Sequence, residues 1–363
     1  MFVLVPLFVR SLGGTESTVG ALVGVGAFAS VCCRPFVGGL LDRVSRRRTL
    51  LWGQTANTLS FLPFLWIEAL GPTLVAATIV HWIVWGYLFA AYFTYAADLS
   101  PPARRAEGIA IFGMWGILTN GLGPTLGEWL IARGGFPWLF GVAAGFGALS
   151  LALTLLVPFT PAPPVVAGRS VRSDLGVLLR RRGGGPRRVF VVMALFGAGI
   201  NAVFYFLALF SRTVGIERVA PFFLAYSGTS VVLRLFGRRL PDRLGPHRVA
   251  VPFLAVFGLG LLGVCGLPAA GVMVMAGMAC GAGHGVLWPV LQSLALDRTA
   301  AAMAGSTVAL STAALDVGGV VGNPIFGWVA ETFGYRPMFT LAAGCAVVAL
   351  GLLANDPMRH RAT

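Results

Sequence analysis

The chain consists of long apolar stretches separated by short polar connections. The stretches lie near residues 17–40, 49–68, 72–97, 106–131, 135–158, 188–210, 217–237, 248–267, 270–296, 302–330 and 335–354. Each has about the 20 residues that an α-helix needs to cross a bilayer. None shows the alternation of period two that a membrane barrel requires, and in lipid every backbone group must find its partner within the span. The pattern predicts eleven membrane-spanning helices, preceded at 1–12 by a stub too short to span alone.

Composition agrees with a membrane protein. Apolar residues make up 57% of the 363 residues and charged residues 11%, against about 25% in a typical soluble domain. The charge is one-sided, because 27 basic residues, all of them arginine, accompany 13 acidic ones for a formal net charge of +14. A basic balance can indicate a nucleic-acid partner, but the apolar excess favours a lipid bilayer, so we expect no nucleic-acid partner.

The arginines predict the orientation of the chain. If the connection after residue 41 is cytoplasmic, twenty arginines fall on the cytoplasmic side and five on the other, with Arg34 and Arg234 left within helix ends. Arginine is enriched in the cytoplasmic connections of membrane proteins. We therefore expect a multi-pass protein of the cell membrane with a cytoplasmic C-terminus.

An internal repeat divides the chain into two parts. Residues 30–48 align without gaps on 230–248, and eight of the nineteen positions are identical. The repeat predicts two homologous six-helix halves, 1–159 and 188–363, related by an axis along the membrane normal. The basic segment 160–187 between them is expected to be a cytoplasmic linker, either a solvated tether or a surface helix on anionic headgroups.

The same repeat bears on the first helix. Arg10 matches Arg212, which places Met1 opposite Val203. Because the corresponding helix begins near Arg188, roughly 15 residues of helix 1 are expected to be missing, through a misassigned start or a truncation.

Three motifs resemble those of the major facilitator superfamily. The first is similar to the family's loop signature G-x-L-a-D-r-x-G-r-k and comprises Gly38, Leu40, Asp42, Arg43, Arg46 and Arg47. A weaker second copy comprises Leu240, Asp242, Arg243 and Gly245. Gly123, Pro124 and Gly127 resemble the GPxxGG signature of proton-coupled exporters, with Glu128 in place of the last glycine. The arginine of the family's fourth helix is absent, and Trp82 stands at its position.

The resemblance implies a fold and a gating mechanism. The fold is all-α and polytopic, with two pseudo-symmetric six-helix bundles and 12 transmembrane helices, the first incomplete. Asp42 would face the N-terminus of a helix in the other half near residue 301, while Arg43 would pair with Asp98; the mirror set is Asp242, Arg243 and Asp297. Arg34 and Arg234 belong to the same gating set. These contacts would stabilise the outward-open state; alternatively, the arginines serve topology alone.

Prolines lie within two of the predicted spans. Pro124 removes a helical amide and is expected to kink its helix, and Pro324 with Gly327 repeats the pattern of Pro124 with Gly127. The two helices would act as a pair of bent gates. Tight helix packing at these small residues, without gating, is the alternative.

An acidic residue lies in the middle of the span 302–330. Asp316 has no arginine or lysine at a matching depth in our assignment, and a charge there costs about 2.5–3.5 kcal/mol on insertion scales. We expect it to bind a proton or a substrate cation; a neutral structural carboxyl is the alternative. Glu128, near the outer end of its helix, is a weaker candidate that could reach the headgroups.

Polar and aromatic side chains recur on one face of three spans: His81, Trp85 and Tyr92; His284, Trp288 and Gln292; and Asn201 with Tyr205. In the family, helices 1, 4, 7 and 10 line the central cavity. The resemblance thus implies an aromatic, weakly polar pocket for a lipophilic or aromatic solute. Ordinary packing is the alternative for each residue alone.

The motifs of several other protein classes are missing from the sequence. There is no nucleotide-binding motif and no hydrolase arrangement, and the five cysteines lie in apolar stretches without ligand spacing. We expect no enzyme, no cofactor, no metal site and no disulfide. The favoured function is proton-coupled export of a small drug-like or metabolic solute by a monomer. An importer or facilitator, or a non-transporting sensor or degenerate gene product, is the alternative.

Overall fold

The computed structural model describes residues 3–101, 105–158, 186–237, 239–299 and 303–356. The predicted linker 160–187 lies outside these ranges except for its last two residues. The surroundings of Gly38 and the side chains of Asp42, Arg43 and Asp242 also lie outside the description, although the backbone of these residues belongs to helices.

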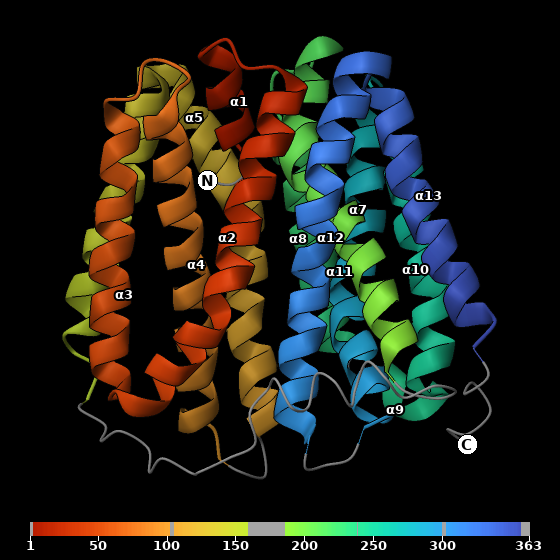
Figure 1. The fold of residues 1–363 in the computed structure, drawn as a ribbon. Coiled ribbons are helices and arrows are strands. Elements are labelled where there is room, and N and C mark those ends of the chain that lie inside the picture. Colours follow the sequence, from red (N-terminus) through yellow and green to blue (C-terminus); the bar gives the residue numbers. More distant parts are fainter. Residues whose placement is uncertain (1–2, 102–104, 159–185, 238, 300–302, 357–363) are drawn as a thin grey trace.

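The described chain is helical throughout (Figure 1). Its helices are α1 (Val5–Ser11), α2 (Glu16–Arg43), α3 (Arg46–Phe61), the 3₁₀ turn η1 (Leu62–Leu65), α4 (Pro72–Leu99), α5 (Arg105–Thr154), α7 (Arg187–Thr213), α8 (Ala220–Phe236), α9 (Leu240–Leu244), α10 (Pro246–Val264), α11 (Ala270–Leu296), α12 (Ala304–Phe333) and α13 (Tyr335–Ala354).

Each predicted span corresponds to one helix, or to one arm of α5. The spans 106–131 and 135–158 are the two arms, which meet at Gly135, where the backbone leaves helical geometry with φ of 71°. Within the described residues, eight helices are long and apolar enough to cross a membrane, with α5 counted once, while α8 is apolar but has only 17 residues. The chain is therefore a multi-pass membrane protein, and the all-α fold class is confirmed.

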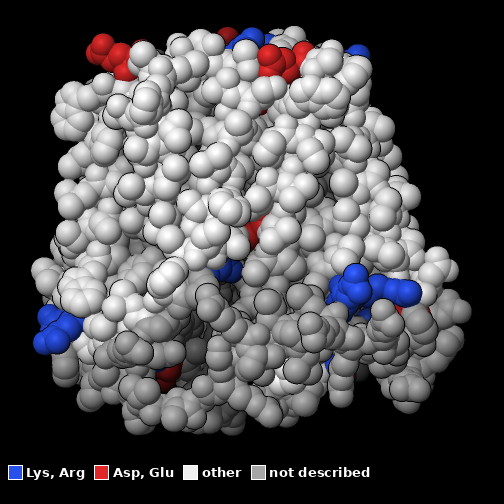
Figure 2. Space-filling view, viewed as in Figure 1, with Lys and Arg blue, Asp and Glu red and all other residues white. Residues whose placement is uncertain are grey.

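The helices form two groups that lie side by side (Figure 1). We call α2 to α5 the N-terminal group and α7 to α13 the C-terminal group. The two groups meet where α2 packs on α12 and where α5 packs on α8. The upper end of Figure 1 holds α1 and the starts of α2, α8 and α13, and the lower end holds the ends of α4, α11 and α13. Figure 2 shows charged side chains at both ends of a wall that is mostly white.

Small residues let the groups approach closely. A Cβ atom on Gly24 of α2 would lie 2.8 Å from the ring of Pro324, and one on Gly327 would lie 3.1 Å from the Cα of Gly20. On the other contact, a Cβ on Gly121 of α5 would lie 2.9 Å from Ser227 of α8. These contacts match the tight packing that small residues permit between membrane helices.

The predicted bends at Pro124 and Pro324 do not interrupt their helices. Both α5 and α12 continue through the proline, and α5 departs from helical dihedral angles beyond it, at Gly135. At that position the positive φ suits glycine, which has no Cβ to clash.

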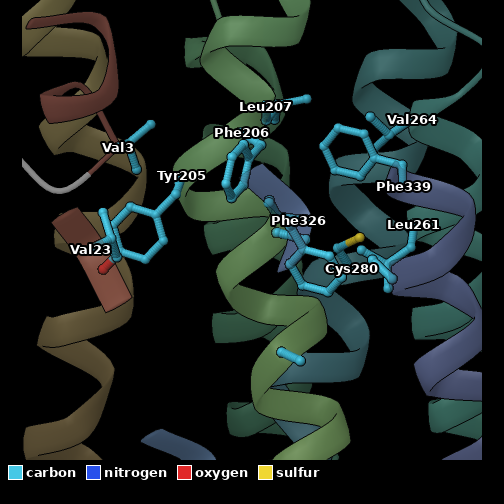
Figure 3. Packing of buried hydrophobic residues seen from close by; sticks show 14 of the residues in the cluster. Val3, Val23, Tyr205, Phe206, Leu207, Leu261, Val264, Cys280, Phe326 and Phe339 are labelled. Atoms are coloured by element: carbon cyan, nitrogen blue, oxygen red, sulfur yellow. The ribbon is translucent and has the colours of Figure 1, made fainter. Parts of the chain in front are cut away.

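The largest buried side chains lie mainly in the C-terminal group. Phe206, Phe326 and Phe339 are each at most 1% exposed and pack around α7. Figure 3 shows these rings inside the group, whereas Tyr205 points from α7 toward Val3 and Val23 on the other side. Tyr205 therefore belongs to the boundary between the groups.

Candidate transport pathway

An ion pair joins the two groups inside the bundle. Arg34 of α2 donates from Nη2 to Oδ2 of Asp316 on α12, and the two side chains are 26% and 27% exposed. This corrects the expectation that Asp316 has no basic partner at its depth. The helix containing Arg34 continues to Arg43, so Arg34 lies about 14 Å inside its end along the axis.

Aromatic side chains surround the middle of the boundary. The rings of Trp82 on α4 and Tyr205 on α7 have centroids 6.1 Å apart. A Cβ on Gly26 would lie 2.7 Å from the indole nitrogen of Trp82. Trp82, at the position of the family's missing arginine, therefore contacts both α2 and α7.

An aromatic ladder descends α4 from this point. Trp82, Trp85, Phe89 and Phe93 follow at centroid distances of 6.3, 5.3 and 4.5 Å. They share one face of the helix, since their spacing is three or four residues. Trp85 was predicted to line the pathway; Trp82, Phe89 and Phe93 were not, although the same spacing was visible in the sequence.

Two other predicted lining residues point into the N-terminal group instead. His81 is 5% exposed, its Nδ1 lies 2.9 Å from the hydroxyl of Ser60, and its ring lies 4.8 Å from Phe61. The hydroxyl of Tyr92 lies 3.4 Å from that of Ser150 on α5. The expectation of one lining face is thus wrong for these two, because that face of α4 packs on its own group.

The predicted lining residues of α7 and α11 also include some that pack within their own group. His284 shares a hydrogen bond with the hydroxyl of Tyr226, and Asn201 accepts one from Asn323 over 3.3 Å, both within the C-terminal group. Trp288 packs on the hydrophobic core, and Gln292 is half-buried. From this set, Tyr205 contacts the other group, through Trp82.

Carboxylates join the groups at the upper end. Glu128 of α5 accepts hydrogen bonds from the backbone N–H of Val219 and of Ala220 over 2.6 and 3.4 Å, and so caps α8. Glu331 of α12 accepts from the N–H of Ser17 near the start of α2, over 3.0 Å. A helix N-terminus favours such negative charge. Glu128 therefore contacts the opposite group rather than only reaching toward headgroups.

A cavity lies at the same end. It measures 380 Å³, and its lining includes Arg10, Glu16, Arg212 and Tyr335. The hydroxyl of Tyr335 donates to Glu16 over 2.8 Å, which adds a link between α13 and α2.

The lower end shows other pairs than those predicted. Asp98 accepts from Nε of Arg46 over 2.6 Å, whereas the expected partner Arg43 has an undescribed side chain. Arg47 donates to the carbonyl of Leu155. Asp297 and Arg243 are both exposed and do not form the predicted pair with each other. The contacts of Asp42 and Asp242 lie outside the described residues.

A buried ion pair at this end was not predicted. Arg298, after α11, reaches Asp356, after α13, over 2.6 Å, with side chains 5% and 2% exposed. Both residues follow apolar stretches and resemble ordinary polar connections in the sequence. Only the adjacent ends of two helices reveal the pair.

The sequence repeat has a structural counterpart. Ser30 of α2 faces Gly86 of α4, and Ser230 of α8 faces Gly285 of α11, where a Cβ would lie 2.9 Å from the serine Cα. One turn further along, Arg34 and Arg234 occupy equivalent positions in the two groups. Nε of Arg234 donates to the carbonyl of Gly285 over 3.1 Å.

The arrangement suits binding and release of a solute or proton. It offers an ionisable pair between the groups, an aromatic face and a second half-buried arginine. Within the described ranges, no group of three His, Cys, Asp or Glu side chains could hold a metal ion.

Comparisons with known proteins agree over the whole length. The model of the Major Facilitator Superfamily matches residues 1–322 and 219–362. An uncharacterized MFS-type transporter of Salmonella typhimurium is 25% identical over 95% of this chain and 89% of its own length. One of Pseudomonas aeruginosa is 27% identical over 96% and 86%.

Solved structures share the fold. The nucleoside transporter NupG, as a mutant, superposes with a TM-score of 0.80 at 14% identity, covering 98% of this chain and 94% of that one. The peptide transporter POT, also as a mutant, gives 0.77 at 18%, covering 100% and 91%. The human organic anion transporter MFSD10 gives 0.68 at 17%, covering 97% and 95%. The chain belongs to the Major Facilitator Superfamily, whose members are membrane transporters and not enzymes.

Proposed function

We propose that this protein is a proton-coupled secondary transporter that exports a small organic solute, and that the two helix groups rock against each other. The observation that carries the proposal is the Arg34–Asp316 pair, because it joins α2 to α12 across the boundary that alternating access must open.

Protonation of Asp316 would weaken this link. The attraction between two charges is several-fold stronger in a protein interior than in water. A proton on Asp316 removes one of the charges and leaves Arg34 without its ionic partner. Proton binding and movement of the groups are thereby coupled through one carboxyl.

The contacts at the upper end support a state closed on that side. Glu128 and Glu331 each bind backbone N–H groups of the opposite group, and α2 packs on α12 through glycine. We take the lower end as cytoplasmic, from the positions of the arginines. Epitope tags after Thr363, probed in intact and permeabilised cells, test this orientation: antibody access before permeabilisation would reverse it.

The solute class follows from the aromatic ladder. Trp82, Trp85, Phe89 and Phe93 present flat apolar faces at the boundary of the two groups. Fold neighbours whose names record nucleosides, peptides and organic anions are consistent with a small organic cargo.

Flux through proteoliposomes tests the proposal. The solute is chosen as the compound that most raises the unfolding temperature of the purified protein. An imposed pH gradient should drive its flux in the wild type and fail to do so in Asp316→Asn. Glu68→Gln removes an exposed carboxylate at the upper end and should transport normally.

Three outcomes would contradict the proposal. Equal flux with and without the gradient would indicate a facilitator. Flux driven only toward the cytoplasm would indicate an importer. No flux of any stabilising compound would favour a non-transporting protein.

A further inference from the structure

The two halves place an arginine at the same point of the boundary between them. Arg34 and Arg234 are related by the offset of 200 residues, and each follows a serine that packs on glycine of the neighbouring helix, Gly86 or Gly285. The positions are therefore equivalent in structure as well as in sequence.

The partners of the two arginines differ. The same offset aligns Pro124 with Pro324 and Gly127 with Gly327, so the counterpart of Asp316 on α5 is Gly116. A Cβ atom on Gly116 would meet no atom within 4 Å. Where α12 has a carboxylate, α5 leaves open space.

Arg234 nevertheless faces α5 across the boundary. A Cβ on Gly113, one turn before Gly116, would lie 3.5 Å from Nη1 of Arg234. Nε of Arg234 is used by the carbonyl of Gly285, and no described carboxylate lies within ion-pair distance of the guanidinium. A half-buried guanidinium with no counter-charge among the described side chains is unfavourable, so an anion at this point would be stabilised.

An aromatic wall borders the same space. The ring of Phe93 would lie 3.7 Å from the Cβ placed on Gly113, next to Arg234. From Phe93 the ladder continues through Phe89 to Trp85. A charged group at Arg234 thus has an apolar, flat surface beside it for the rest of a molecule.

We propose that Arg234 binds the anionic group of the cargo, and that the cargo is an aromatic carboxylate whose ring lies on the ladder of α4. The carboxylate of the cargo takes the place that the carboxylate of Asp316 takes opposite Arg34. An arginine can bind a carboxylate through two parallel N–H donors. The role in transport rests on the proposed function, whereas binding itself does not.

Binding to the purified protein in detergent tests the inference without any gradient. The probes are benzoate, phenylacetate and indole-3-acetate, each paired with its neutral amide, and affinity is measured by calorimetric titration. We expect at least one acid to bind about tenfold or more tightly than its amide, and this preference to disappear in Arg234→Gln.

A second variant gives Arg234 a carboxylate partner, and an uncharged variant at the same position is its control. Gly116→Asp has room for its side chain and should give Arg234 a carboxylate of its own, reducing acid binding by about tenfold or more. Gly116→Asn adds a similar volume without charge and should retain affinity within about threefold. These variants keep the test valid if Arg234→Gln does not fold.

The results separate this inference from the proposed function. If no acid binds better than its amide, or if Gly116→Asp and Gly116→Asn bind equally well, the inference is wrong. If the acid binds through Arg234 but a pH gradient drives no flux, the inference stands and proton coupling fails. If gradient-driven flux of a neutral solute survives Arg234→Gln, coupling stands and the inference fails.

Discussion

Arg34 and Arg234 occupy equivalent positions in two related halves, but they meet different partners across the boundary. Arg34 has Asp316 opposite it, whereas Arg234 lies beside Gly113, and a Cβ on Gly116 one turn further along would meet no atom within 4 Å. If each arginine had an acid opposite it, both contacts between the groups would be ion pairs within the protein, and neither would need a bound ligand. Leaving one arginine without an acid makes one contact internal and the other dependent on a bound anion.

The largest expected effect comes from breaking the internal pair on one side only. Arg34→Gln leaves Asp316 buried without its partner, and losing one member of such a pair costs about 3–5 kcal/mol when it is fully buried. At this partly exposed site we expect the free energy of unfolding to fall by about half that amount. Denaturant unfolding in detergent measures it. The double variant Arg34→Gln/Asp316→Asn should recover much of it; no recovery would show that the two residues contribute independently.

Exchanging the acid between the halves tests the equivalence directly. In Gly116→Asp/Asp316→Gly the carboxylate moves from α12 to α5, so that Arg34 becomes the arginine without an acid. Carboxylate binding lost in Gly116→Asp should return to within about threefold of wild type in the double variant, since Arg234 is again without an acid and Arg34 is too. Calorimetric titration of the two variants measures this recovery. If the double variant binds the carboxylate as weakly as Gly116→Asp does, the two halves are not interchangeable.

Filling a close glycine contact tests the packing of α2 on α12 against an open position on α8. Gly24→Leu on α2 would collide with Pro324 and is expected to cost about 1–3 kcal/mol. The matched change Gly228→Leu on α8, where a Cβ would meet no atom within 4 Å, should cost little. Thermal unfolding of both variants is the measurement; equal losses would contradict tight closure at α2 and α12.

A smaller effect is expected from the carboxylate at the upper end. Glu128→Gln weakens the cap on α8, and caps contribute about 0.5–2 kcal/mol. The upper end should then open more often, and in a chain without other cysteines maleimide should label Leu209→Cys, a buried position that lines the cavity of that end, faster. Unchanged labelling would remove Glu128 from the closure of that end.

The smallest effect is expected at the lower end, where the conformational equilibrium should shift in the direction opposite to that of Glu128→Gln. Asp42→Asn removes the predicted contact that stabilises the outward-open state, so maleimide should label Phe93→Cys faster and Leu209→Cys more slowly. Maleimide labelling of both positions measures the shift. Unchanged accessibility would leave the loop arginines with a topological role alone.

Much of the architecture could be predicted from the sequence, because a helix in lipid must satisfy its own backbone and therefore needs one long apolar stretch. The spans 270–296 and 335–354 coincide with α11 and α13. The spans 106–131 and 135–158 placed the junction of the two arms of α5, although the positive φ of Gly135 itself leaves no mark in an apolar pattern.

The candidate site was less predictable. Spacing placed His81, Trp85 and Tyr92 on one face of α4 but could not say which neighbour that face meets, and His81 and Tyr92 pack within their own group. Arg34 and Asp316 are separated by 282 residues, and no local pattern indicates that they meet.

The sequence by itself determined the membrane spans, the repeat and the family motifs, because these depend on local hydrophobicity and on similarity along the chain. The tertiary structure decided which side of each helix faces the boundary, and hence which charges meet. The repeat aligned Arg34 with Arg234 and Asp316 with Gly116, but only the packing of α2 on α12 and of α5 on α8 shows that one arginine has an acid and the other faces open space. Pairing across a boundary depends on helix rotation, and rotation is fixed by contacts distant in the chain.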